Sequence, residues 1–427
     1  MPAPVALFLC LIVFMLIKVP IAWSLILASL VALLIDGDYP LAVAVQRMFT
    51  GADTFSLLAI PFFMLAGEIM ARGGLSKRLC TFANSLVGSF HGGLSLVSIV
   101  ACTFFAAISG SSIATTAAIG GLMVPEMTSR GYPKDFASAV QAIGGTLGIV
   151  IPPSVVFIMY GTATNTSITD LLMSGVIPGF LTGAALCGVA YVVSKKNKYP
   201  RDSDFSMSEV WRSFKDAVPS LLMPVIILGG IYAGVFTPTE SAAIAVVYGF
   251  IICIFVYREI TFRDVITILT NTAKTTASLM LLVVAAQLFG WLVTIFNVPA
   301  IATDFVMSAA SSPTTFLGFT VILLLFTGMF MEDGATVLIL GPIMAPMAAA
   351  FGVDPIHFGF VMVFTLAIGQ ATPPFGTTLF VACGLTKESI VRVGKRLIPF
   401  LGVEAACAFL FAFVPALSIW LPYLLKK

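Results

Sequence analysis

Two stretches of this sequence, I-G-Q-A-T-P-P-F-G at residues 368–376 and G-G-T-L-G-I-V-I-P-P-S at residues 144–154, place paired prolines inside long apolar segments. A proline within a helix removes one backbone donor, and its ring clashes with a carbonyl group one turn earlier. Backbone groups freed in this way are costly in lipid unless another partner replaces the lost hydrogen bond. The two stretches therefore predict two discontinuous helices, each with freed carbonyl groups that a bound cation can satisfy.

The composition indicates a membrane protein. The chain has 427 residues, of which 59% are hydrophobic and only 10% are charged, and its mean hydropathy is +1.07. A soluble protein carries roughly 25% charged residues. Apolar runs of about 20 residues recur along the chain, which is the length an α-helix needs to cross a bilayer, and they lack the alternation of barrel strands. We therefore predict an all-α polytopic membrane protein embedded in the lipid bilayer.

The charged residues and the cysteines exclude several kinds of partner. The net charge is +2, and no basic tract is long enough to bind nucleic acid. The seven cysteines lie singly in apolar runs, without the spacing of a metal site. The first residues lack the basic region and cleavage site of a secretory signal, so we expect a membrane helix there. Glu68 lies four residues before Arg72, and we expect the two to pair along one helix.

Residues 94–127 and 315–350 are each too long for a single membrane crossing, and polar residues interrupt each near its middle, I-S-G-S-S at 108–112 and F-M-E-D-G at 330–334. Each segment is either two crossings or one re-entrant hairpin. If both are hairpins, nearly all Lys and Arg residues of the loops fall on one side of the membrane, as the positive-inside rule requires of the cytoplasmic side. We therefore favour two hairpins, with the N-terminus in the periplasm.

The sequence also contains an internal repeat. One constant offset in residue number, which carries Ala114 onto Ala335 and is called the repeat offset below, aligns positions 114–153 with 335–374 without a gap. Basic loops of the first copy have counterparts around 295–301 and 351–355 that lack Lys and Arg, so we expect the copies to face opposite sides of the membrane. Inverted repeats of this kind are typical of secondary transporters. The identical aligned pairs are Ala114 and Ala335, Thr115 and Thr336, Gly120 and Gly341, Met123 and Met344, Pro125 and Pro346, Gly131 and Gly352, Val140 and Val361, Gly148 and Gly369, Pro152 and Pro373, and Pro153 and Pro374.

Each proline break lies downstream of a polar hairpin tip, at the same distance in both copies. Carbonyl and hydroxyl oxygens, without His or Cys, suit a hard monovalent cation better than zinc or copper. We therefore predict one Na⁺ site in each repeat, and thus two or more coupling ions. The predicted ligands are Ser109, Ser112, Gly145, Val150 and Pro152 in site 1, and Gly334, Thr365, Gly369, Thr372 and Pro373 in site 2.

Ser112, Ser154 and Asp333 are the predicted substrate contacts. Helix N-termini beyond the tips and breaks present free N–H groups and positive dipole ends, which favour an anionic substrate. Asp333 aligns with Ser112 in the repeat, and a carboxyl group within a membrane segment is a functional-site candidate because it is costly when unpaired. The alternatives are that the prolines only kink their helices, that Glu332 is solvated, and that Ser154 only bonds its own helix backbone.

In combination, five stretches resemble the large membrane subunit of tripartite ATP-independent periplasmic (TRAP) transporters, and the resemblance covers essentially the whole chain. It implies an all-α fold with inverted repeats, two re-entrant hairpins and two discontinuous helices, similar to elevator-type members of the ion transporter superfamily and driven by sodium. The stretches are I-P-F-F-M-L-A-G-E-I-M at 60–70, F-A-A-I-S-G-S-S-I-A-T at 105–115, G-G-T-L-G-I-V-I-P-P-S at 144–154, G-V-F-T-P-T-E-S-A-A at 234–243 and A-T-P-P-F-G at 371–376.

The resemblance also implies partners, a location and a substrate class. The expected partners are a small four-helix membrane subunit and a soluble periplasmic protein that delivers the substrate. No segment like the small subunit precedes Met1, so we expect it as a separate chain. The chain is similar first to transporters for sialic acid and next to those for C4-dicarboxylates. We therefore predict sodium-coupled uptake of an organic carboxylate across the bacterial inner membrane.

The elevator mechanism suggests a division of the chain into a stationary scaffold and a moving transport domain. Polar segments near 195–217 and 258–270 are expected to be amphipathic arms along the membrane interface that brace the scaffold. We assign 1–71 to N-terminal scaffold helices, 72–168 to a first transport repeat with hairpin 94–127 and broken helix 136–168, 169–296 to scaffold helices and amphipathic arms, 297–385 to a second transport repeat with hairpin 315–350 and broken helix 356–385, and 386–427 to a C-terminal helix.

Two other functions remain open at this point. G-S-S-I at 110–113 matches the G-x-S-x pattern of an intramembrane serine protease, but that chemistry needs a histidine base at membrane depth. The two histidines, His91 and His357, are predicted to lie in loops and to be structural. A membrane scaffold that transports nothing would need no broken helices. We therefore predict that the chain is a transporter and not an enzyme.

Overall fold

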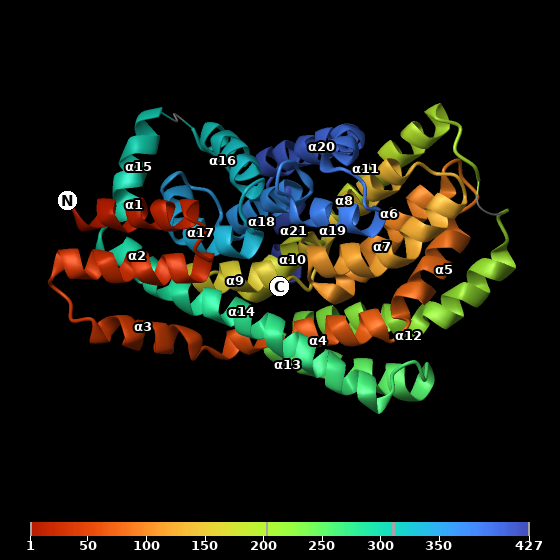
Figure 1. The fold of residues 1–427 in the computed structure, drawn as a ribbon, viewed down its shortest axis with the longest axis horizontal. Helices are drawn as coiled ribbons and strands as arrows, with labels where there is room; N and C mark the ends of the chain where they lie inside the picture. Colours follow the sequence, from red (N-terminus) through yellow and green to blue (C-terminus); the bar gives the residue numbers. More distant parts are fainter. Residues whose placement is uncertain (1, 202–203, 310–311, 426–427) are drawn as a thin grey trace.

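The computed structural model describes residues 2–201, 204–309 and 312–425, and these residues form helices joined by short turns, with no strand among them (Figure 1). Seven helices in the described ranges are long and apolar enough to cross a bilayer, and the bent pair α8 and α9 passes the same criterion when taken as one span. The prediction of an all-α polytopic membrane protein is therefore confirmed.

The helices keep the chain order of the predicted segments. The first half contains α1 (Ala3–Leu16), α2 (Ile21–Asp36), α3 (Ala42–Ala52), the 3₁₀ turn η1 (Phe55–Leu58), α4 (Ala59–Arg72), α5 (Leu75–Val87), α6 (Gly93–Ser109), α7 (Ser112–Ser129), α8 (Lys134–Val150), α9 (Val155–Thr164), α10 (Ile168–Ser174) and α11 (Val176–Lys196). The second half contains α12 (Met207–Tyr232), α13 (Pro238–Ile251), the π-helical turn η2 (Ile252–Val256), α14 (Phe262–Ile295), α15 (Val298–Ala309), α16 (Pro313–Gly328), α17 (Asp333–Ala350), α18 (Pro355–Ala371), α19 (Thr377–Thr386), α20 (Ile390–Phe413) and α21 (Ala416–Leu425).

The internal repeat extends well beyond the residues that are identical in sequence. The repeat offset carries α7 onto α17 and α8 onto α18 with the same first and last residues. The same offset carries α2 onto α13 with η2, and α3 with α4 onto the single helix α14. Apolar positions tolerate volume-conserving exchanges of Leu, Ile, Val and Met, so these outer helices have kept their lengths without keeping their residues.

The two interrupted segments are helical hairpins. Helices α6 and α7 pack on each other and on α8, and α16 and α17 pack on each other and on α18. At the first tip, Ser109, Gly110 and Ser112 are buried within the protein. A loop between two full crossings would instead lie at the surface, where water satisfies its backbone groups. The buried tip therefore supports the hairpin interpretation.

Both proline pairs break a helix, as predicted. The first break separates α8 from α9 at residues 151–154, and the two helix axes differ by 43°. The second break separates α18 from α19 at residues 372–376. The Pro152–Pro153 and Pro373–Pro374 peptide bonds are both cis, so the repeats share the local backbone geometry as well as the sequence.

The helices form two groups. Hairpins and broken helices pack with α10, α11, α20 and α21 in one group, while α2, α4, α13 and α14 pack against one another in the other (Figure 1). Helices α4 and α14 also contact α6 and α17, so they lie at the boundary between the groups. Helices α10 and α11, which we assigned to the scaffold, contact α6, α8, α20 and α21 in this structure.

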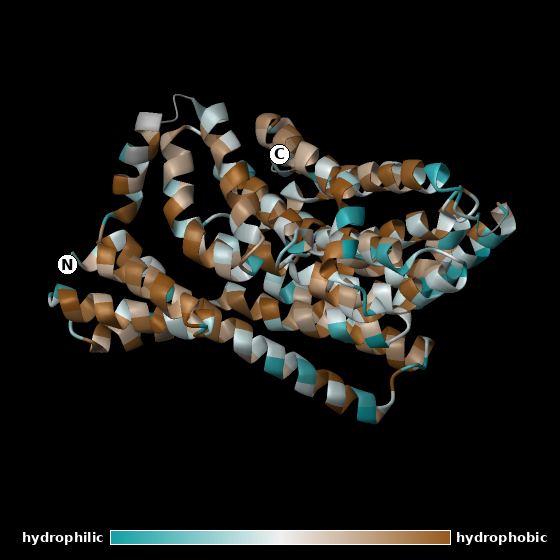
Figure 2. Cartoon of the chain, turned by 45° about the horizontal axis from the view of Figure 1, so that its top comes forward, coloured by the Kyte–Doolittle hydropathy of each residue, from teal (hydrophilic) through white to brown (hydrophobic). Residues whose placement is uncertain are grey.

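Two predicted segments differ from the structure in detail. The segment predicted as a single C-terminal helix is two helices, α20 and α21, because Pro415 lies at the break and cannot continue a helix. The amphipathic arms are not separate helices. They form the first turns of α12 and α14, each of which runs on without interruption into an apolar span (Figure 2).

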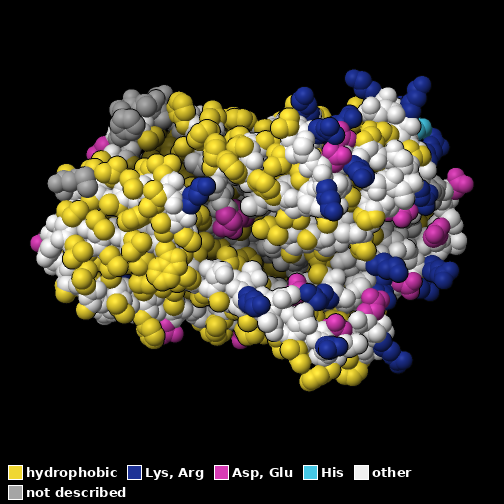
Figure 3. Space-filling model, viewed as in Figure 1, with side chains coloured by type: hydrophobic (Ala, Val, Ile, Leu, Met, Phe, Trp, Pro, Cys, Tyr) yellow, Lys and Arg dark blue, Asp and Glu magenta, His cyan; other side chains and the backbone are white. Residues whose placement is uncertain are grey.

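Lys and Arg side chains gather at one end of the molecule. In Figure 3 they lie mainly at the right-hand end, over α5, the ends of α11 and α12, and the start of α14, whereas the left half of the surface is mainly hydrophobic. The basic loops that the sequence grouped on one side of the membrane therefore lie on one side of the folded chain. This agreement supports the hairpin topology on which that grouping depends.

Candidate functional site

The first hairpin tip touches the first helix break directly. Gly110 has a φ of +63°, a backbone conformation that turns the chain between α6 and α7 without strain only for glycine. Its carbonyl oxygen accepts a hydrogen bond of 3.3 Å from the Val155 N–H at the start of α9. A Cβ on Gly110 would lie 2.7 Å from the carbonyl oxygen of Pro153. Tip and break are thus in backbone contact, and only glycine fits between them.

Several hydroxyl groups lie around this contact. The Ser109 and Thr115 hydroxyls are 2.7 Å apart and share a hydrogen bond, and Ser111 caps the N-terminus of α7. The Ser154 hydroxyl accepts a hydrogen bond of 3.4 Å from the Phe157 N–H and so caps α9. The Ser112 hydroxyl is buried and has no hydrogen-bond partner among the described residues. A buried hydroxyl without a partner is uncommon and indicates a missing ligand or water.

Glycines on α8 bring that helix against the first tip. A Cβ on Gly145 would lie 1.8 Å from the Thr116 hydroxyl and 3.3 Å from the Ser112 carbonyl oxygen. The structure therefore brings together three of the predicted ligands of Na⁺ site 1, Ser109, Ser112 and Gly145. Pro152 lies in the adjacent buried break, whereas the Val150 carbonyl oxygen lies against the backbone of Gly175 between α10 and α11.

The second tip and break also meet, but through different groups. The rings of Phe330 at the tip and Phe375 at the break are 6.0 Å apart. Just below them, Gly369 of α18 packs against the backbone of Gly328, and a Cβ on Gly369 would lie 2.5 Å from the Gly328 carbonyl carbon. Here aromatic packing and a glycine contact take the place of the hydroxyls and hydrogen bond of the first repeat.

The other predicted ligands of Na⁺ site 2 already have neighbours. The Thr365 and Thr372 hydroxyls donate to carbonyl oxygens one turn earlier in α18, at 2.7 Å and 2.8 Å. Pro373 packs against Gly394 of α20. Gly334 faces Met159 of α9 rather than the second break. In the second repeat the predicted ligands are therefore spread over several contacts.

Acidic residues begin α17 at the second tip. The Glu332 side chain accepts a hydrogen bond of 3.0 Å from the Ala335 N–H and so caps the helix. Asp333 follows it and is only 4% exposed. Because α17 packs on α9, the first turn of α17 lies beside the helix that follows Ser154. The two repeats thus meet through the predicted substrate contacts Ser154 and Asp333 and their helices.

A buried carboxyl group next to the first site was not predicted. Glu404 of α20 is 1% exposed, and it accepts a hydrogen bond of 2.6 Å from the Thr146 hydroxyl of α8. Its second oxygen has no partner in the described part of the chain. The signal was present in the sequence, because Glu404 is the one acidic residue in the apolar segment 397–424. Its partner is 258 positions away, and only the fold shows the pair.

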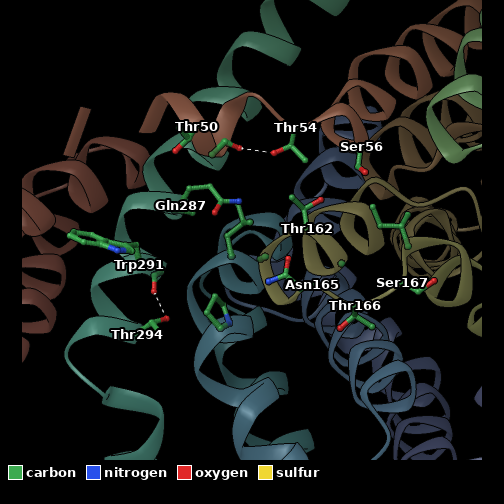
Figure 4. A pocket seen from close by; sticks show the side chains of 18 of the residues that line it. Thr50, Thr54, Ser56, Thr162, Asn165, Thr166, Ser167, Gln287, Trp291 and Thr294 are labelled. Carbon is green, nitrogen blue, oxygen red and sulfur yellow. Dashed lines mark hydrogen bonds between the residues drawn. The ribbon is translucent and has the colours of Figure 1, made fainter. Parts of the chain in front are cut away.

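A large cavity lies between the two groups of helices. Its volume is about 750 Å³, and it is lined by α3, η1 and α14 on one side and by α9, the α9–α10 turn and α17 on the other. Figure 4 shows Gln287 of α14 facing Thr162 and Asn165 across this space. The lining is rich in hydroxyl and amide groups, and Arg47 of α3 is its one ionised side chain among the described residues. The sequence analysis did not place this cavity.

The histidines argue against serine protease chemistry. His91 lies in a turn, as predicted, but the loop prediction for His357 is wrong, since this residue is in the first turn of α18. His357 is buried, and its ring nitrogens lie 2.8 Å from the Ser418 hydroxyl and 3.1 Å from the Ala412 carbonyl oxygen. Its hydrogen bonds therefore go to the C-terminal helices. The Ser112 hydroxyl has no base bonded to it in the described residues.

Comparison with known proteins identifies the family. Residues 8–417 match the model of the DctM component of tripartite ATP-independent periplasmic transporters. The C4-dicarboxylate TRAP transporter large permease protein DctM of Rhodobacter capsulatus is 40% identical, over 97% of this chain and 98% of that protein. The sialic acid TRAP transporter large permease protein SiaM of Vibrio cholerae is 37% identical, over 95% of each chain.

A solved structure gives an independent comparison of the fold. The YdaH transporter of Alcanivorax borkumensis superposes with a TM-score of 0.67, over 89% of this chain and 88% of that chain, at 14% identity. At this identity the similarity concerns the fold alone. The relatives carry names of transporter permeases, which supports the prediction that the chain is not an enzyme.

Proposed function

The chain belongs to the DctM component family of tripartite ATP-independent periplasmic transporters, and we propose that it couples the inward movement of Na⁺ to the uptake of an organic carboxylate. One observation carries the proposal: in both repeats a buried hairpin tip meets a helix broken at a Pro-Pro pair. Such a junction frees backbone oxygens within the membrane, and a cation can take the place of their lost partners.

The first repeat gives the stronger support for an ion site. The Ser112 hydroxyl is buried and has no partner among the described residues, and Ser109, Gly145 and the break surround it. Neutral oxygens without a carboxylate cage suit Na⁺ better than a divalent ion. In the second repeat the nearby buried Asp333 supplies a negative charge, which would favour a cation directly.

The substrate is proposed from the relatives and from the charges of the chain. The two relatives named above act on a C4-dicarboxylate and on sialic acid, and both of these are organic carboxylates. Either class fits the predicted anionic substrate. Because this chain shares 40% identity with the C4-dicarboxylate permease and 37% with the sialic acid permease, the two remain alternatives for its substrate.

The proposed mechanism is an elevator. Repeats 72–168 and 297–385 would move together against scaffold helices in 1–71 and 169–296, with 386–427 completing the chain. The cavity between the two helix groups supports this division, because a moving boundary needs a polar, incompletely packed interface. In the inner membrane the N-terminus would face the periplasm. A small membrane subunit and a periplasmic binding protein would complete the transporter.

The test is uptake into proteoliposomes that contain this chain, its small membrane subunit and its binding protein. We expect labelled succinate or N-acetylneuraminate to accumulate with an inward Na⁺ gradient and not with choline in its place. Ser112→Ala and Asp333→Ala should each abolish most of the uptake. Accumulation that does not change when choline replaces Na⁺ would rule out sodium coupling, and variants as active as the native protein would rule out the proposed sites.

A further inference from the structure

The cavity between the two helix groups has features of a binding site for a small anion. Its volume of about 750 Å³ falls in the range of ligand pockets, which is roughly 300–1,000 Å³. It is lined from both groups of helices, so a bound solute would contact the proposed scaffold and the proposed transport domain together. Figure 4 shows the polar side chains of both groups converging on the same space.

Arg47 is the one ionised group among the described lining residues, and none of the described carboxylates pairs with it. The ion pairs that the structure shows join other arginines to acids, and Arg47 takes part in none of them. Its guanidinium carbon lies 5.0 Å from the ring centre of Trp291 on α14. This stacking positions the side chain without using its hydrogen-bond donors, which stay available to a ligand.

The platform under Arg47 is itself held in place. The rings of Trp291 and Tyr39 pack edge to face with their centres 5.3 Å apart, which limits the movement of the tryptophan. Close packing of α3 on α14 gives the same result from the other side, because a Cβ on Gly51 would lie 2.6 Å from side-chain atoms of Gln287. The guanidinium group is therefore presented to the cavity from a rigid pair of helices.

The neutral groups of the cavity complement a polar carboxylate. Thr162, Asn165 and Thr166 come from the end of α9, and Gln287 faces them from α14 (Figure 4). Hydroxyl and amide groups donate and accept hydrogen bonds, so they suit a hydroxylated or amidated carbon chain. A guanidinium group binds a carboxylate through two parallel hydrogen bonds, which makes it the natural anchor for the charged end.

We propose that Arg47 anchors the carboxylate of the transported solute in this cavity, before the solute reaches the hairpin tips. The inference rests on the proposed function and names a residue that selects its substrate. A carboxylate side chain of the binding protein has the same chemistry as the solute, so the experiment must separate the two sources.

The experiment compares Arg47→Gln, Arg47→Lys and the matched control Arg263→Gln in the purified complex of this chain with its small subunit. Arg263 is also an exposed arginine, in the first turn of α14, and it does not line the cavity. Equilibrium binding of labelled succinate and of N-acetylneuraminate is measured without the binding protein. We expect Arg47→Gln to weaken binding of the recognised probe about tenfold, because a charged hydrogen-bond pair is lost.

Arg47→Lys should recover part of the affinity, since Lys keeps the charge but not the two-point geometry. Arg263→Gln should bind like the native complex. If Arg47→Gln binds the solute normally but no longer binds the loaded binding protein, the arginine is a docking residue and the proposal is wrong. A native complex that transports a probe but does not bind it alone also overturns the proposal. If the native complex transports neither probe, it is the proposed function that fails.

Discussion

The two contacts between hairpin tip and helix break occupy equivalent positions in the two repeats, yet their chemistry differs. The repeat offset carries Ser109 onto Phe330 and Ser154 onto Phe375. In the first repeat these positions hold hydroxyls beside a backbone hydrogen bond, and in the second they hold two rings in contact. Duplication has kept the backbone, and divergence has given the two copies different side chains. We infer that the two junctions do different work.

Exposure separates the two junctions further. Ser109 and Ser154 are almost completely buried, whereas Phe330 is 50% exposed and Phe375 is 57% exposed. A buried junction keeps water out and suits a bound ion. An exposed pair of rings can separate without breaking a hydrogen bond, which suits an entrance to the site. The comparison therefore predicts that the first junction determines ion affinity and the second determines access.

The largest expected effect comes from the glycines on which both junctions depend. Gly148→Ala would place a Cβ 2.5 Å from the Ser111 carbonyl oxygen, and Gly369→Ala would place one 2.5 Å from the Gly328 carbonyl carbon. Backbone atoms cannot rotate away, so we expect a loss of about 3 kcal/mol in stability, at the upper end of overpacking effects, and almost no uptake. Thermal unfolding in detergent measures the first effect, and Gly121→Ala, where the new methyl group meets open space, is the control.

The buried pair next to the first junction should have the next largest effect. Thr146→Val removes the one hydrogen bond to the Glu404 side chain among the described residues and leaves a buried carboxyl group without a partner. We expect a loss of about 2 kcal/mol in stability, again measured by unfolding in detergent. The equivalent of Thr146 in the second repeat is Ala367, so Ala367→Val has no hydrogen bond to lose there. A Thr146→Val protein as stable as the native one would mean that the pair contributes nothing.

A smaller effect separates the roles of the two junctions. Ser109→Ala should raise the Na⁺ concentration for half-maximal uptake about tenfold, equivalent to about 1.4 kcal/mol, because one hydroxyl ligand is lost. Phe330→Ala should leave that concentration unchanged and alter the maximal rate. Sodium titrations of uptake in proteoliposomes measure both quantities. If both substitutions shifted the Na⁺ dependence equally, the division of roles would be wrong.

The smallest effect is expected at the surface of α4, outside both junctions. The predicted pair of Glu68 and Arg72 is confirmed, with 2.8 Å between the carboxylate oxygen and the guanidinium nitrogen. Both side chains are about one-third exposed or more, so solvent screens the interaction. Glu68→Gln should lower stability by no more than about 0.5 kcal/mol, as unfolding in detergent would report. A loss several times larger would show that this helix carries a role absent from the comparison.

Much of the fold could be predicted because its signals are local in the sequence. Composition identifies the solvent of the chain, and the proline pairs and polar tips mark the breaks and hairpins without any tertiary information. The loop assignment for His357 failed because its hydrogen bonds go to Ser418 and Ala412, far along the chain. The single C-terminal helix failed because Pro415 was not weighed against the apolar run around it.

The candidate site was predictable only in part. Ser109, Ser112 and Gly145 meet because the hairpin tip and the break are each marked by their own residues. The cavity around Arg47 could not be found in this way, since its walls come from helices in both halves of the chain.

The sequence by itself determined that this chain is a duplicated helical membrane protein with two broken helices, because hydropathy and proline chemistry act over a few residues. Only the tertiary structure decided that one junction is sealed by hydroxyls and the other by rings, that Glu404 is bonded to Thr146, and that Arg47 faces a polar cavity. Those facts depend on distances between segments remote in sequence, and the packing of whole helices sets these distances.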